Sequence, residues 1–342
     1  MKLSSQLFAR MGKCCRILLS LTILAVPGSL FAFRSCGSAT CPLNNYRSIH
    51  GGWFNLSLTH EYINQDEIYV GSTRSAIGAI PGDHDEVQTI NERNDLSLQA
   101  GISDALSIGM NLPFISRQHS HIGHEGGNDV WESWNFSGIG DLRLSASYAL
   151  LLPSEPTDPD IVVIGGIKFS TGVTRLRNDA GEQAEVPIQP GTGSTDGIVA
   201  LNVRQPIADA PTLSGVYGII PLVVGASYQF NGSGTDGYKF GNVFLAHLES
   251  MYQFASRASI LLQFNGKFQG YADVGTTKEP RENTGGTWVF VSPGLNVHLN
   301  DALEGTAYVQ FPLYQNVHGI QQSARYNLSM TLSYSLNLFE HE

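Results

Sequence analysis

The sequence predicts an all-β protein: a transmembrane, antiparallel, up-and-down β-barrel of about twelve strands, preceded by a signal peptide. Three observations lead to this prediction. The chain starts like an exported protein, its segments alternate apolar and small polar residues, and the connections between segments alternate between short and long. Charged residues make up only 15% of the chain, against roughly 25% in soluble domains, which favours a barrel surrounded by lipid.

The first 32 residues have the layout of a secretory signal. A positively charged start is followed by an apolar run, 17–26, and then by the helix-breaking sequence Pro27-Gly28-Ser29. The apolar run is too short to span a bilayer, so we expect residues 1–32 to be a cleaved signal peptide. The alternative is a short buried helix. Export and a barrel together place the protein in the bacterial outer membrane.

Charge limits the choice of partners. Removal of the signal peptide takes away four positive charges and no negative one, which changes the net charge from −10 to −14. Such an acidic balance argues against nucleic acid as a partner. The partners that we expect instead are outer-membrane lipid and a small-molecule solute.

Residues 33–52 are predicted to form a periplasmic N-terminal segment that carries a cysteine pair, Cys36 and Cys41. An even pair in an exported chain favours a disulfide, and Gly37 and Ser38 allow the turn that brings the two Cβ atoms within about 4 Å. The disulfide would rigidify this segment as a cover or short plug at the periplasmic mouth. A metal-binding dithiol and a redox pair are the alternatives.

The predicted barrel covers residues 53–342, and its last segment shows the period of two most clearly. In 326–338 the leucines, Met330 and Tyr334 fall on one face, whereas the serines, Thr331 and the asparagines fall on the other. A soluble sandwich would carry many Lys and Glu residues on its polar face. Small uncharged polar residues are typical of a barrel lumen instead. The aromatic end of this segment, at Phe339, resembles the signal that barrel-insertion machinery reads.

Twelve segments of this kind follow one another along the chain: 53–63, 87–101, 106–116, 138–152, 161–170, 196–206, 213–230, 243–254, 258–271, 287–299, 303–312 and 326–338. The long connections between them are 64–86, 117–137, 171–195, 231–242, 272–286 and 313–325. The other connections are short turns. Short periplasmic turns, long external loops and an even strand number are the pattern of outer-membrane barrels.

The polar faces predict which charged side chains point into the lumen, since an Arg or Lys facing lipid at the midplane costs about 2–4 kcal/mol. The predicted lumen residues are Glu61, Arg93, Asp95, Asp141, Arg143, Lys168, Arg204, His247, Glu249, Lys267, His298 and Glu304. Either they line a water-filled path and tune its selectivity, or they pair across the barrel and fill it.

Three histidines, His119, His121 and His124, lie in the second predicted long loop. On an extended segment His119 and His121 project to the same side, so both imidazoles could bind one zinc or copper ion, with His124 or Glu125 completing the site. The alternative is a polar exposed loop. No other cofactor is expected.

The chain also resembles a known family, the outer-membrane barrels assigned to transport in the MetA pathway of phenol degradation. The resemblance rests on stretches spread over most of the chain: Cys36-Gly-Ser-Ala-Thr-Cys41-Pro42, His60-Glu61-Tyr62-Ile63-Asn64-Gln65-Asp66, Gln189-Pro-Gly-Thr-Gly-Ser194, Asn231-Gly-Ser-Gly-Thr-Asp-Gly-Tyr238, Glu282-Asn-Thr-Gly-Gly286 and Tyr308-Val-Gln-Phe-Pro-Leu-Tyr314. The resemblance implies a channel or transporter-type barrel, without naming phenols as its cargo.

Three functions remain open at this point. The first is a channel for passive or facilitated passage of small solutes, with apolar or aromatic ones in the candidate range, and without a covalent step. The second is a closed structural or metal-binding barrel that acts through its extracellular loops. The third is an outer-membrane lipase. The chain contains neither a G-x-S-x-G nor an H-E-x-x-H motif, and we therefore expect no enzymatic activity.

Overall fold

The computed structural model describes residues 50–79, 86–125, 128–155, 157–211, 217–277 and 280–337. The predicted signal peptide, Cys36 and Cys41, and the final Phe339 lie outside the described residues, so the predictions made for them are not tested here.

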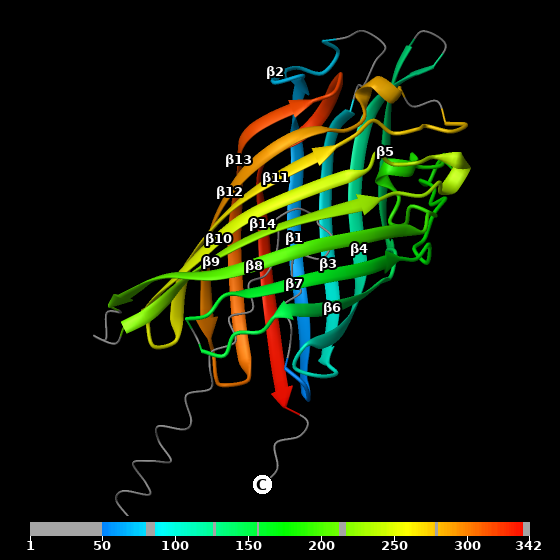
Figure 1. Ribbon diagram of the computed structural model, residues 1–342. Coiled ribbons are helices and arrows are strands. Elements are labelled where there is room, and N and C mark those ends of the chain that lie inside the picture. The colour runs from blue at the N-terminus through cyan, green and yellow to red at the C-terminus, as the bar shows by residue number, and fades with distance from the viewer. Residues whose placement is uncertain are drawn as a thin grey trace, which may run out of the picture. The chain divides into compact units, whose positions relative to one another are not determined.

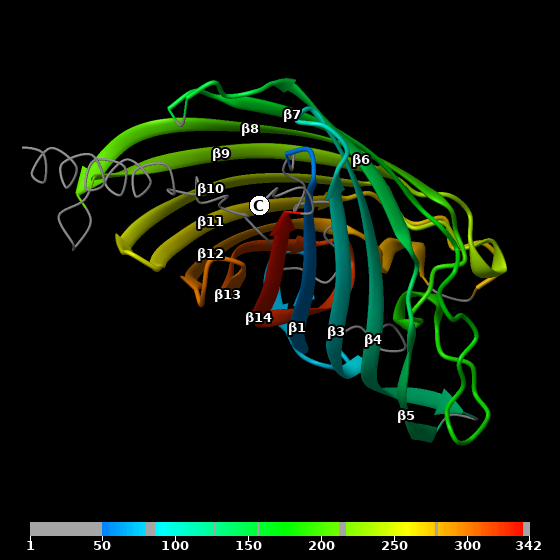
Figure 2. The same ribbon diagram turned by 90° about the horizontal axis from the view of Figure 1, so that it is seen from below.

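The described residues form one antiparallel sheet of fourteen strands that closes on itself (Figure 1). Two strands, β2 and β5, each pair with a single neighbour, which leaves a closed circuit of twelve. The circuit closes where β14 pairs with β1, from Trp53 opposite Asn337 to Val70 opposite Ile320 (Figure 2). The strands are β1 (Trp53–Val70), β2 (Thr73–Ser75), β3 (Glu86–Gly101), β4 (Leu106–Glu125), β5 (Asn128–Ile139), β6 (Arg143–Leu151), β7 (Asp160–Lys168), β8 (Asp196–Pro211), β9 (Tyr217–Phe230), β10 (Val243–Ala255), β11 (Ala258–Gln269), β12 (Gly286–His298), β13 (Leu303–Val317) and β14 (Ile320–Asn337). The predicted twelve-strand barrel is confirmed.

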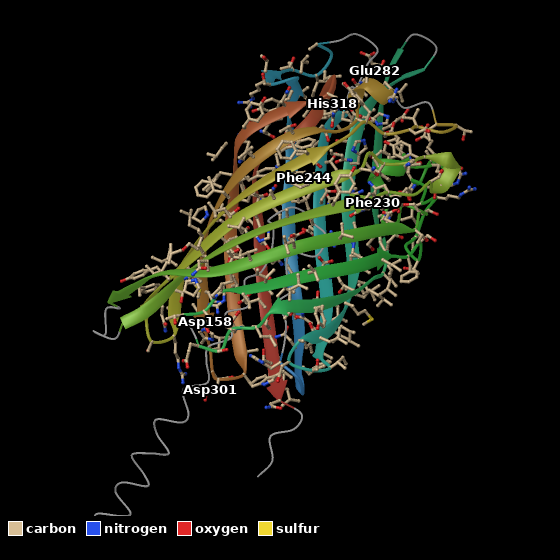
Figure 3. All side chains as sticks on the ribbon, viewed as in Figure 1. Asp158, Phe230, Phe244, Glu282, Asp301 and His318 are labelled. Atoms are coloured by element: carbon tan, nitrogen blue, oxygen red, sulfur yellow. The ribbon has the colours of Figure 1, made fainter. Side chains whose placement is uncertain are left out.

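The two faces of the wall differ as the alternation predicts. On β14, Leu332 is 47% exposed whereas its neighbour Ser333 is only 2% exposed. Phe230 and Phe244, labelled in Figure 3, lie where β9 ends and β10 begins and are also exposed. An apolar outer surface of this extent is unfavourable in water but suits lipid. Because the sheet closes, its backbone N–H and C=O groups form hydrogen bonds with each other, which the lipid of a bilayer could not provide.

Two predicted long loops are wrong. Residues 117–137 are mostly strand, because β4 runs to Glu125 and β5 begins at Asn128. Residues 313–325 are likewise mostly strand, with only two residues between β13 and β14. In β5 the outward side chains at Ser133 and Ser137 are polar and exposed, so the apolar face that the sequence reading required is interrupted. In 313–325 the neighbouring residues Leu313 and Tyr314 are both exposed, which breaks the period of two.

The predicted strand 138–152 is divided in the structure. β5 ends at Ile139 and β6 begins at Arg143, and both pair with β4. Between them Gly140 N–H donates to the carbonyl of Pro113 at 2.8 Å and the carbonyl of Leu142 accepts from Phe169 N–H at 2.8 Å. The interruption lets Asp141 bond to the loop that follows β7.

Connections differ in length at the two ends of the barrel. Asp158 and Asp301 lie in short turns at one end, whereas Glu282 and His318 lie at the other (Figure 3). The longer connections 169–195, 231–242 and 270–285 carry three short 3-10 helices, η1 (Val186–Ile188), η2 (Thr235–Gly237) and η3 (Arg281–Asn283). None of these helices is long and apolar enough to cross a membrane.

These three connections pack on one another, and we call them the loop cluster. Val186, Tyr238 and Ala272, one from each connection, form a small buried apolar core. Connection 169–195 also packs against the wall, since Ala184 and Ile188 bury Trp134 of β5. Tyr238 is 2% exposed, so the cluster is packed as firmly as a protein interior.

Candidate functional site

None of the twelve predicted lumen residues is exposed. The most deeply buried are Lys168 and Glu249, each 2% exposed. Asp95, Arg204 and His298 retain partial exposure, as do Arg143 and Lys267. Their role in lining a solute path stays a prediction.

Many of these side chains are paired. Arg93 Nε lies 2.7 Å from Asp95 Oδ1, and Arg204 Nε lies 2.6 Å from Asp160 Oδ2. His298 Nδ1 lies 3.7 Å from Glu304 Oε2. Such pairs support the reading in which opposite charges fill part of the interior, because a charge taken out of water needs a partner.

Lys168, at the end of β7, lies at the centre of the most buried polar group. Its Nζ lies 3.1 Å from Asp141 Oδ2 and 2.7 Å from Asp196 Oδ2, and it also donates to the hydroxyls of Thr192 and Ser194. Asp141 in turn accepts from Gly172 N–H and Thr192 N–H, both at 2.9 Å. Two predicted lumen residues therefore tie both ends of connection 169–195 to the wall.

A close approach of two glycines completes this attachment. A Cβ on Gly191 would lie 2.5 Å from the carbonyl carbon of Gly172, well inside van der Waals contact. Gly191 N–H donates to Val173 O at 2.8 Å. The two ends of connection 169–195 can therefore touch only because neither carries a side chain at this point.

The histidines lie on β4, and not in a loop as predicted. His119 and His121 do project to the same side, with His119 Nε2 3.4 Å from His121 Nδ1. His121 Nε2 lies 2.8 Å from Glu132 Oε2, and His119 Nδ1 lies 2.8 Å from Thr89 Oγ1. The side chain of His124 lies outside the described part. Among the described residues, no three His, Cys, Asp or Glu side chains are placed to hold a metal ion.

The inner face bounds a cavity of about 540 Å³ next to the loop cluster. This volume is within the range of small-molecule sites. The cavity wall combines aromatic rings with charged and amide groups, and its main lining residues are Trp288, Phe290, Tyr238, Phe240, Arg117, Lys267, His119, His121, Glu86 and Glu185.

Two cations define the polar side of this cavity. Arg117 of β4 donates from Nε to Asn91 Oδ1 at 2.5 Å and from Nη1 to the Pro187 carbonyl at 3.1 Å. Lys267 Nζ lies 5.1 Å from the centre of the Trp288 ring, within the range of a cation–π interaction. The cavity thus offers an apolar surface and positive charge side by side.

Sequence reasoning found Lys267 but missed most of this cavity. Arg117 was placed in a predicted loop, and Tyr238 and Phe240 come from a connection. Trp288 and Phe290 gave a usable signal, since both fall on the polar face of segment 287–299. Two aromatic residues on a lumen face indicate a site for an apolar group.

A closed β-barrel with an apolar outside and a polar, cavity-bearing interior defines the class: an outer-membrane β-barrel. No protein-family model and no curated protein sequence matches the chain. Among solved structures, it is similar to an outer membrane channel from Pseudomonas putida F1, with a TM-score of 0.61 and 12% identity over 86% of this chain and 100% of that chain. A more distant likeness is the NanC porin, with a TM-score of 0.44 and 10% identity over 82% of this chain and 100% of that chain.

Proposed function

We propose that the protein is a channel that passes small solutes across the outer membrane, and that the 540 Å³ cavity is the station at which they bind. The observation that supports this proposal most directly is the presence of this cavity inside a closed barrel. Passage needs no covalent step and no resident cofactor. Selection follows from the width and the charge of the path.

The cavity lining supports solutes that combine an apolar or aromatic body with a polar or anionic group. Trp288, Phe290 and Phe240 offer ring surfaces, and Arg117 and Lys267 offer positive charge. The resemblance to the barrels of the MetA pathway of phenol degradation supports a channel or transporter-type barrel. Outer-membrane lipid and, during biogenesis, barrel-insertion machinery are the other partners that we propose; nucleic acid is not one of them.

Efflux of benzoate and of acetate from liposomes that carry the refolded protein tests this proposal. The two anions have the same charge and differ in the ring. We expect the protein to release both, and we expect Trp288→Ala to lower the preference for benzoate over acetate. Trp131→Ala is the matched control, because Trp131 lies on the outer face and is 61% exposed.

Two outcomes would contradict the proposal. Liposomes with correctly folded protein that retain both anions would exclude a channel and leave a closed structural barrel. An equal effect of the Trp288 and Trp131 substitutions would exclude the cavity as the site of selection.

A further inference from the structure

The last two strands, β13 and β14, are paired along only part of their length. Their backbone pairing runs from Leu303 opposite Tyr334 to Gln310 opposite Asn327. Beyond that point, within the fully described stretch 303–337, residues 311–317 pair only with β12 and residues 320–326 pair only with β1. In Figure 1, β13 bends over with β12 while β14 runs upright beside β1. We call this unpaired stretch the seam.

Three slips of register accompany the seam. The register of β13 against β12 slips by one residue, Leu313, directly after Pro312. The register of β14 against β1 slips twice, once between Ala324 and Asn327 of β14 and once between Gln65 and Glu67 of β1. Proline has no N–H to donate to a neighbouring strand, and a bulge bends the strand that carries it. Each strand therefore follows its other neighbour.

The outer side of the seam is apolar and aromatic. Phe311, Leu313, Tyr314 and Tyr326 are between 42% and 60% exposed. Aromatic side chains of this kind form the girdles of outer-membrane barrels at the level where lipid meets water. The charged groups beside this outer side are Arg325 and its partners Asp66 and Glu67, at 3.5 and 2.9 Å.

The inner side of the seam is polar and belongs to the cavity. Gln315, Ser323 and Asn327 are buried and line the cavity wall. Ser323 Oγ donates to Gln315 Oε1 across the seam, and Asn327 Nδ2 donates to Gln310 Oε1 at 2.7 Å at its lower end. Along the seam, side-chain hydrogen bonds thus take the place of the backbone hydrogen bonds that join the rest of β13 and β14.

Neighbouring elements hold the upper end of the seam. Val317 N–H donates to the Gly71 carbonyl at 3.0 Å, and Ile320 N–H donates to Asn283 Oδ1 at 3.1 Å. The loop cluster bounds the same cavity through Tyr238 and Phe240. Backbone hydrogen bonds to other elements therefore fix the upper end of the seam.

We propose that the seam is a lateral portal through which apolar and aromatic molecules pass between the cavity and the bilayer, with the Ser323–Gln315 hydrogen bond as its latch. This inference rests on the proposed channel function. Polar solutes and ions do not take this path, because it leads into lipid, where a polar group loses its hydrogen bonds to water. The portal therefore separates two classes of solute that enter one cavity.

Bridging the seam tests the portal. In a background with Cys36→Ser and Cys41→Ser, the pair Gln315→Cys/Ser323→Cys is joined by a short bismaleimide. The control is Ala307→Cys/Met330→Cys, which bridges directly opposite residues of the paired part. Entry of the lipid-soluble dye N-phenyl-1-naphthylamine into cells that carry each protein is compared with the ion conductance of the same purified proteins.

We expect bridging to lower dye entry far more than ion conductance, each compared with the same double-cysteine protein before it is bridged. The control bridge should change neither. Ser323→Ala, which removes the latch without a crosslink, should increase dye entry, and Ser329→Ala, below the seam, should not. Unchanged dye entry in both seam variants, or equal loss of dye entry and conductance on bridging, would overturn the portal. A wild-type protein with conductance but no dye entry would overturn the portal alone, and one with neither would overturn the channel as well.

Discussion

At the scale of single residues, Lys168 is the charge on which the attachment of the loop cluster depends. It is 2% exposed and lies between two carboxylates, Asp141 and Asp196. Removing one partner of a buried charge group leaves the others without compensation, at a cost of about 3–5 kcal/mol. Solvent-exposed pairs contribute far less, typically about 0–1 kcal/mol.

We therefore expect Lys168→Met to lower the free energy of unfolding by about 3–5 kcal/mol, measured by denaturant unfolding in lipid vesicles. The triple variant that also carries Asp141→Asn and Asp196→Asn should recover part of the loss. Arg175→Met is the control, because the Arg175–Asp236 pair is largely exposed. Equal stability of the Lys168 and Arg175 variants would show that the buried group does not hold the loops.

The histidine pair gives a second prediction at this scale. His119 and His121 face each other at 3.4 Å, and both line the cavity. We expect zinc or copper to bind to this pair, the described part of the site that the sequence predicted from His119, His121 and His124, and not to be needed for the fold. Calorimetric titration of the wild type against the triple alanine variant measures this. Two indistinguishable weak isotherms would exclude metal binding here.

Alternation along a strand predicts the face of a residue but not its partner. None of the charged residues assigned to the lumen face is exposed, which agrees with the period of two in strand geometry. The bonds of Asp141 to Gly172 and Thr192 depend on how a loop returns to the barrel. No local pattern carries that information.

At the scale of elements, the outward face of each strand is selected by lipid. Leu144 is exposed and its neighbour Ser145 is buried. Arg at a lipid-facing position near the midplane costs about 2–4 kcal/mol. We expect Leu144→Arg to block insertion of the barrel, while Ser145→Arg still yields folded protein. The heat-dependent shift of the folded barrel in gel electrophoresis is the measurement, and equal folding of both variants would contradict the assigned faces.

The strands were predictable where apolar and polar residues alternate regularly and unpredictable where they do not. The upper part of β4 carries His119 and His121 on one face, and Gln118 and Ser120 on the other. With Ile122 as its single apolar residue, this stretch has no period-two signal. Backbone pairing with β3 and β5 continues all the same. The upper part of β13 was missed for another reason: Leu313 and Tyr314 are neighbours and both are exposed, so the period of two is broken there.

At the scale of the whole molecule, the twelve-strand barrel followed from alternation, connection lengths and low charge, all of which the bilayer imposes on a sequence. The cavity could not be predicted in this way, because its wall is formed by strands together with the three connections of the loop cluster. Val186, Tyr238 and Ala272 meet there from distant parts of the chain. Packing between connections depends on tertiary structure, which the local sequence pattern does not encode.

The central claim is that solutes pass through this barrel by way of the cavity, and single-channel recording in planar bilayers tests it most directly. We expect the refolded protein to give discrete conductance steps, and Arg117→Gln to shift the ion selectivity toward cations by removing a positive charge from the cavity wall. Arg257→Gln, in an exposed turn, should leave the selectivity unchanged. A folded, membrane-inserted protein that gives no conductance steps would contradict the account.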